Sequence, residues 1–235
     1  MKTNTILAGD AQMMSEDYIP DGSIDFVLTS PPYDGANTPK GAAPNLYQYG
    51  FELSRVLKDG GVCVLVIQDI VHNGIKRGHS IRIPSYWIDH TKLNLWDDYI
   101  YWRGGQEGYW WKNRIRKDHD YMWIFVNNAN KPKTFNKIRY SNQGSIFDYR
   151  TEKRKTNLRR HKKEKGKLYP VAFPFQLAED MIRIFTKKDD LVLDPFCGYG
   201  TTLAAAKVLN RRYLGIELLE HVASIATKHL EAGLL

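Results

Sequence analysis

Short apolar runs separated by polar turns dominate the chain, and several are apolar at nearly every position. Examples are "SIDFVLT" at 23–29, "VCVLVIQD" at 62–69 and "DYMWIFVN" at 120–127. Runs of this length and density are typical of strands covered on both faces, as in a parallel sheet. The same pattern, bounded by turn residues, predicts further strands at 4–9, 98–102, 189–194 and 212–218.

Other stretches have apolar residues at helical spacing. In residues 45–61 they recur every three or four positions, and the paired glycines at 60–61 predict the end of a helix there. Further helices are expected from about 175, at 201–210 and at 220–234. Strands alternating with helices predict an α/β fold: an open, mostly parallel, doubly wound sheet.

Charge is distributed unevenly along the chain. Residues 101–170 hold 19 Lys and Arg against 6 Asp and Glu, a balance of +13, while the rest holds 15 against 20, a balance of −5. A basic segment on a mildly acidic body favours a polyanionic partner such as nucleic acid. A solvated, partly disordered surface segment is the alternative, and charge alone leaves both open.

The 235 residues are enough for one sizeable core. Two cysteines, Cys63 and Cys197, provide neither a disulfide framework nor a zinc site. Since the sequence has no run of 18 apolar residues and no signal-peptide core at its start, we expect a soluble, cytoplasmic protein with no membrane partner.

The stretch "LVLDPFCGYGTTLAAAKVLNRRYLGIEL" predicts a cofactor site. A strand ends at Asp194, a turn containing Gly198 and Gly200 follows, and Thr201–Thr202 opens a helix whose free N–H groups suit a negative group. Glu217 ends the next strand, where an acidic residue binds ribose hydroxyls in βαβ units. The turn is not a dinucleotide G-x-G-x-x-G motif, and this difference favours a ligand with a carboxylate over one with a pyrophosphate. S-adenosyl-L-methionine (SAM) is the leading candidate. A tight turn that only packs the helix on the sheet is the alternative.

A second motif, "SPPY", ends the strand at 23–29. Ligands gather beyond the carboxyl ends of the strands in open α/β sheets, so this motif and the glycine turn should share one rim. The prolines free the Pro31 carbonyl from any strand ladder, Ser30 adds a second acceptor, and Tyr33 offers a flat face. An exocyclic amine on an aromatic base needs this set, although a plain proline turn would explain the motif taken alone.

Six segments in this order resemble one family: the amino-methylating DNA methyltransferases of bacterial restriction–modification systems and phages. They are "ILAGDA", "IDFVLTSPPY", "RVLKDGG", "RKDHDYMWIF", "YPVAFPFQLAEDMI" and "VLDPFCGYGTTLAAAKVLNRRYLGIEL". Because "SPPY" precedes the glycine turn, the chain is similar to the β class, which implies a circularly permuted, Rossmann-like methyltransferase fold. Tyr169 stands where the family usually has a histidine.

The resemblance implies roles for individual residues. Ser30, Pro31, Pro32 and Tyr33 would surround the target amine, Asp10 would reach the adenine end of SAM, and Phe173–Pro174 would pack near its methionine end. The remaining residues expected to form the SAM site are Asp194, Phe196, Gly198, Gly200, Thr201, Thr202 and Glu217.

Direct transfer of the methyl group, without a covalent adduct on the base, is the expected mechanism. Neither cysteine is placed as the nucleophile that ring-carbon methylation needs, and the target base must leave the duplex. Serine at the head of the motif favours N4 of cytosine in this family, with N6 of adenine as the alternative. An RNA or protein-amide methyltransferase and a non-catalytic nucleic-acid binder are further alternatives.

The resemblance also implies double-stranded DNA as a partner, a possible cognate restriction endonuclease, and a division of the chain. Residues 1–128 would form the catalytic half, with a Trp-rich loop at 103–119; 129–168 would be a basic insertion for target recognition, and 169–235 the SAM-binding half. Cations beside aromatic rings suit DNA contact. The residues expected to contact DNA are Trp110, Lys112, Arg114, Arg116, Arg154, Arg159 and Arg160.

Overall fold

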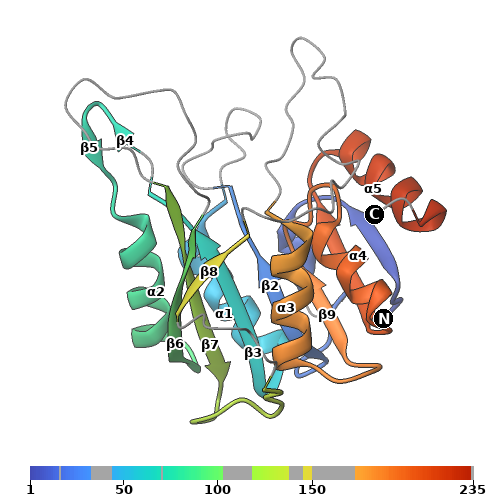
Figure 1. Cartoon of the computed structure of the whole chain (residues 1–235), viewed down its shortest axis with the longest axis horizontal. Coiled ribbons are helices and arrows are strands. Elements are labelled where there is room, and N and C mark those ends of the chain that lie inside the picture. The colour runs from blue at the N-terminus through green and yellow to red at the C-terminus, as the bar shows by residue number, and fades with distance from the viewer. Residues whose placement is uncertain are drawn as a thin grey trace.

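The structure, a computed structural model, describes residues 1–15, 17–32, 44–69, 71–102, 118–137, 145–149 and 173–233. Its centre is an eight-stranded sheet, and a two-stranded hairpin of β4 (Val71–His72) and β5 (Ile75–Lys76) stands apart (Figure 1). The order across the sheet is β1 (Thr5–Ala8), β10 (Arg212–Glu217), β9 (Leu191–Asp194), β2 (Ile24–Thr29), β3 (Leu57–Ile67), β7 (His119–Asn127), β6 (Leu93–Trp102) and β8 (Ile146–Asp148).

Strand directions confirm the mostly parallel sheet. Neighbours from β1 to β3 all pair in parallel, β7 is antiparallel to both β3 and β6, and β8 is parallel to β6. The chain leaves β9 for β10 on one side and β2 for β3 on the other, so the strand order reverses between β9 and β2. Open α/β sheets bind their ligands at such a switch point.

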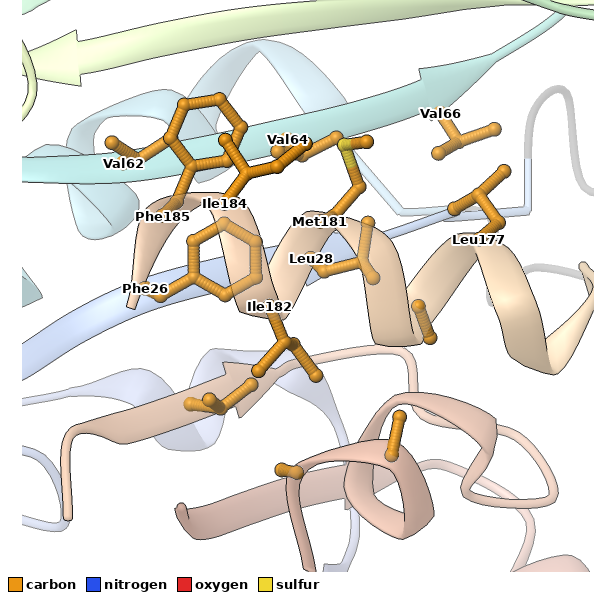
Figure 2. Close-up of a cluster of buried hydrophobic side chains, with 14 of the residues drawn as sticks. Phe26, Leu28, Val62, Val64, Val66, Leu177, Met181, Ile182, Ile184 and Phe185 are labelled. Carbon is orange, nitrogen blue, oxygen red and sulfur yellow. The ribbon is translucent and has the colours of Figure 1, made fainter. Parts of the chain in front are cut away.

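Helices cover both faces of the sheet. On one face, α3 (Phe175–Phe185) packs on β2 and α4 (Thr201–Val208), and α5 (Glu220–Ala232) lies against β1 and β10. On the other face, α1 (Leu46–Val56) packs on β3 and α2 (His79–His90), and a short 3-10 turn, η1 (Ala11–Met14), precedes β2. Figure 2 shows the core under α3, where Met181 lies between Val64 and Leu28 and Leu177 lies beside Val66. The doubly wound arrangement is therefore confirmed.

One predicted helix is shorter than expected, and one helix was missed. The helix expected over 45–61 ends at Val56, and the glycine pair lies inside β3, where Gly60 adopts φ +74°. Leu57 already pairs with Ile24, because the apolar spacing of the helix runs directly into the buried strand and local periodicity does not mark the change. Helix α2, which contains Pro84, was not predicted.

The described parts of the basic segment 129–168, residues 129–137 and 145–149, belong to the fold. The Asn136 side-chain amide donates to the carbonyls of Arg183 (2.8 Å), in the last turn of α3, and of Thr186 (2.9 Å), its C-cap residue. β8 extends the sheet beyond β6, and the Tyr149 hydroxyl donates to Asp180 of α3 at 3.0 Å. Within the described ranges, no helix is long and apolar enough to span a membrane.

Candidate active site

The two predicted motifs meet at the carboxyl ends of β2 and β9, the upper edge of the sheet in Figure 1. These strands pair in parallel, with Phe26 opposite Val192 and Val27 opposite Leu193. Ser30–Pro32 therefore emerges beside the glycine turn that follows Asp194. The structure brings Ser30, Pro31 and Pro32 together with the turn, whereas Tyr33 lies outside the described residues.

Asp194 organises the turn from within. Only 2% of the residue is exposed, and its carboxylate accepts hydrogen bonds from the Thr29 hydroxyl (3.0 Å), the Thr202 hydroxyl (2.6 Å) and the Phe196 N–H (3.1 Å). Burial raises the pKa of Asp194 to about 6, although these donors act in the opposite direction. The carboxylate thus ties β2, the turn and the start of α4 to one another.

The turn itself depends on two glycines with left-handed backbones. Gly198 has φ +52° and Gly200 has φ +86°, a region that residues with a side chain rarely adopt. Gly200 is the N-cap of α4 and provides no side-chain acceptor, so no cap occupies the N–H groups of the first helical turn. A carboxylate placed there would be stabilised by these groups and by the helix dipole.

Glu217 closes the other side of the turn. Its Oε2 accepts from the Gly198 N–H at 2.9 Å and its Oε1 from the Leu219 N–H at 2.8 Å, and the residue is 8% exposed. Burial raises the pKa of Glu217, while the two amide donors oppose the rise. A carboxylate fixed in this way keeps lone pairs for hydroxyl groups of a ligand.

Asp10 reaches the same rim from β1. The Gly9 N–H donates to the Glu217 carbonyl at 2.9 Å, which places Asp10 next to the end of β10. The Tyr49 hydroxyl of α1 donates to Asp10 Oδ1 at 3.1 Å, and the Tyr49 ring lies edge-on to Phe196 with centroids 5.2 Å apart. Burial, followed by the nearby Asp10 charge, raises the pKa of Tyr49, so the phenol keeps the proton that it donates.

Known proteins share this architecture. Residues 24–228 match the family described as DNA methylase, whose members include N6 and N4 methylases. The chain belongs to this family. It is 32% identical to the orphan methyltransferase M.BamHII of Bacillus amyloliquefaciens over 91% of each chain, and 28% identical to the type II methyltransferase M.BglII of Bacillus subtilis over 95% of this chain and 68% of that one.

Solved structures agree with the fold. PvuII DNA methyltransferase, described as cytosine-N4-specific, superposes with a TM-score of 0.79 at 21% identity, covering 98% of this chain and 86% of that one. The M1.HpyAVI–SAM complex superposes with a TM-score of 0.68 at 21% identity, covering 96% and 98%. The protein is a SAM-dependent DNA amino-methyltransferase of the β class, so the predicted family, fold, cofactor and DNA substrate are confirmed.

The donors and acceptors of the methyltransferase's rim fit SAM. Two carboxylates, Asp10 and Glu217, accept from amine and hydroxyl groups, the uncapped start of α4 suits a carboxylate, and Phe196 offers a half-buried ring. Pro174 is the N-cap of α3, which packs on α4. Phe173 packs against the core beside it.

Two residues of this constellation were missed from the sequence. Thr29 could have been found, because it ends β2 directly before Ser30 and its register beside β9 follows from the predicted sheet. Tyr49 carried no signal, since its spacing is that of any core-facing residue of a helix. The seven residues expected to contact DNA lie outside the described residues.

Proposed function

We propose that the methyltransferase transfers a methyl group to the exocyclic N4 amine of a cytosine flipped out of double-stranded DNA. The observation that carries this proposal is the bond from Thr29 to Asp194, which joins the strand ending in Ser30–Pro31 to the cofactor turn. Serine at the head of the motif favours cytosine, and the cytosine-N4-specific PvuII enzyme has the same fold. Adenine N6 is the second candidate, because the family includes both activities.

In this proposal the motif activates the amine by accepting its protons. An amine conjugated to its ring is a weak nucleophile; hydrogen bonds to Ser30 Oγ and the Pro31 carbonyl would pull its nitrogen toward a tetrahedral geometry and aim the lone pair. Bound SAM supplies the methyl group. Pro32 would keep the motif rigid and Tyr33 would stack on the base, so the rate would come from positioning and electrostatics.

The cysteines support direct transfer to the amine. Cys63 is fully buried in β3, and burial raises the pKa of its thiol. Cys197 lies in the turn, where burial and then the nearby carboxylates of Asp194 and Glu217 raise the pKa of its thiol well above the ordinary value. The thiolate is the nucleophilic form of a cysteine, and a raised pKa keeps the thiol protonated. Neither side chain is therefore poised to attack a ring carbon.

On the cofactor side we assign a role to each group of residues. Asp10 and Phe196 would hold the adenine end, Glu217 the ribose, and Phe173–Pro174 the methionine end. The turn and helix start, which would receive the cofactor's carboxylate and be shaped by Asp194, comprise Gly198, Gly200, Thr201 and Thr202.

Two basic segments, the loop at 103–119 and the insertion at 129–168, would supply the DNA contacts. We assign the catalytic half to 1–128, the target-recognition insertion to 129–168 and the SAM-binding half to 169–235, with contacts to phosphates and bases from the loop at 103–119 and the insertion. A cognate restriction endonuclease would recognise the same sequence. The assigned DNA contacts are Trp110, Lys112, Arg114, Arg116, Arg154, Arg159 and Arg160.

The product of the reaction tests the proposal. The protein is incubated with SAM and unmethylated DNA of varied sequence, the DNA is digested to nucleosides, and the methylated nucleosides are identified by mass spectrometry. Formation of 4-methylcytosine is expected, and the Ser30→Ala protein under the same conditions provides the control. Formation of 6-methyladenine instead would overturn the choice of base.

A further inference from the structure

Tyr49 contacts the cofactor side of the rim, although no motif of the chain includes it. It is 8% exposed on α1, whose apolar face packs on β3. From this position it contacts two groups that come from opposite ends of the chain, Asp10 after β1 and Phe196 in the glycine turn.

The contact with Asp10 is directional. The Tyr49 hydroxyl donates to Oδ1 at 3.1 Å, and Asp10 itself is an exposed residue directly before η1. An exposed carboxylate on a short side chain samples several rotamers, and one charge-assisted bond to a buried donor restricts them. A carboxylate has about four lone-pair positions, and the bond from Tyr49 occupies one of them.

The contact with Phe196 sets the plane of a ring. The two ring planes meet at 84° with centroids 5.2 Å apart, the edge-to-face arrangement that aromatic pairs prefer. Phe196 is only half-buried, so one part of its ring remains available to a ligand. Tyr49 therefore fixes both an acceptor for an amine and a flat surface for a planar heterocycle.

We infer that Tyr49 is a positioning residue for the adenine ring of SAM, acting through Asp10 and Phe196 and selecting a purine with an exocyclic amine. This inference rests on the proposed cofactor site. A carboxylate only accepts hydrogen bonds, so a pinned Asp10 attracts an amino group and repels the carbonyl oxygen of hypoxanthine. A tyrosine that merely packs α1 on the sheet would have no influence on this choice.

Isothermal titration of the whole protein tests the inference, with S-adenosyl-L-homocysteine and its inosine counterpart as probes. Tyr49→Phe keeps the ring and removes the donor; we expect affinity for the adenosyl compound to fall about tenfold and the preference over the inosyl compound to shrink by a similar factor. Tyr47→Phe is the matched control, because Tyr47 packs on Tyr86 with centroids 5.2 Å apart. Both properties should be unchanged in this control.

A double-mutant cycle separates the inference from the proposed site. If Tyr49 acts through Asp10, adding Tyr49→Phe to Asp10→Ala should change affinity less than about twofold further. If Asp10→Ala weakens binding while Tyr49→Phe alters neither affinity nor preference, the role of Tyr49 is overturned and the site stands. If Asp10→Ala also leaves binding unchanged, the placement of the adenine end is overturned as well.

Discussion

The Thr29 hydroxyl donates a 3.0 Å hydrogen bond to Oδ1 of Asp194, although the two residues are 165 positions apart in the chain. Thr29 is the last residue of β2 and Asp194 the last of β9, so the bond bridges the switch point of the sheet. The strand that carries the proposed catalytic motif is thereby fastened to the turn that serves the cofactor. This bond is the junction between the two halves of the proposed site, and both stability and activity should depend on it.

Loss of the Thr29 hydroxyl should loosen the junction. Thr29→Val preserves shape but leaves a buried carboxylate with one donor fewer, so the free energy of unfolding should fall by about 1–3 kcal/mol in urea titrations. The rate of methyl transfer should fall too, because Ser30 follows directly. Thr29→Ser keeps the donor and should restore both properties; equal defects in the two variants would assign the effect to packing instead.

Burial of Asp194 makes stability depend on pH. Its pKa rises from 3.8 to about 6 on folding, so the folded state binds the proton more tightly than the unfolded state does. The stabilisation that this proton gives the folded state is lost as the pH rises through 6. Relative to Asp194→Asn, the wild-type free energy of unfolding should therefore fall by about 1 kcal/mol between pH 5 and pH 8. Denaturant titrations of both proteins at the two pH values measure this difference. Parallel pH profiles would contradict the raised pKa.

Removal of the Ser30 hydroxyl should affect chemistry rather than cofactor binding. Ser30→Ala deletes one of the two proposed acceptors for the target amine, so kcat should fall about 100-fold while affinity for SAM changes less than about twofold. Transfer of radiolabelled methyl groups to DNA and calorimetry measure the two quantities. Ser23→Ala, just before the opposite end of β2, removes a hydroxyl that donates to the Pro20 carbonyl and should retain full activity. Full activity of Ser30→Ala would refute the role of the hydroxyl.

Gly215 leaves no room for a side chain behind the glycine turn. An added Cβ would lie 2.5 Å from Leu203 Cδ1 and 2.9 Å from Cys197 Sγ. Gly215→Ala should therefore destabilise the protein by about 1–3 kcal/mol and weaken SAM binding, since Cys197 must shift within the turn. In the Leu203→Ala background, Gly215→Ala should lower the free energy of unfolding by less, because the Leu203 Cδ1 atom that the new Cβ meets is absent. Thermal unfolding of the four proteins tests this, and additive losses would rule out the contact as the cause.

Local sequence was enough to predict most strands, the glycine turn and the rim on which both motifs lie. The buried strands β2, β3 and β9 are apolar over most of their length, and the carboxyl ends of parallel strands share an edge whatever the order of the strands. The boundary at Val56–Leu57 could not be predicted, since both the helix and the strand place apolar residues there. Helix α2 was missed: Pro84 interrupts its pattern, and its stability comes from packing on α1 and β6.

The sequence by itself determined the class of the sheet, the order of the motifs and the chemistry that each motif offers. Only the tertiary structure decided which groups those motifs touch. Thr29 with Asp194, Tyr49 with Asp10 and Phe196, and Tyr149 with Asp180 join segments far apart in the chain. Such contacts follow from strand order and helix placement, which the chain adopts to bury its two apolar faces together, and local periodicity carries no record of them.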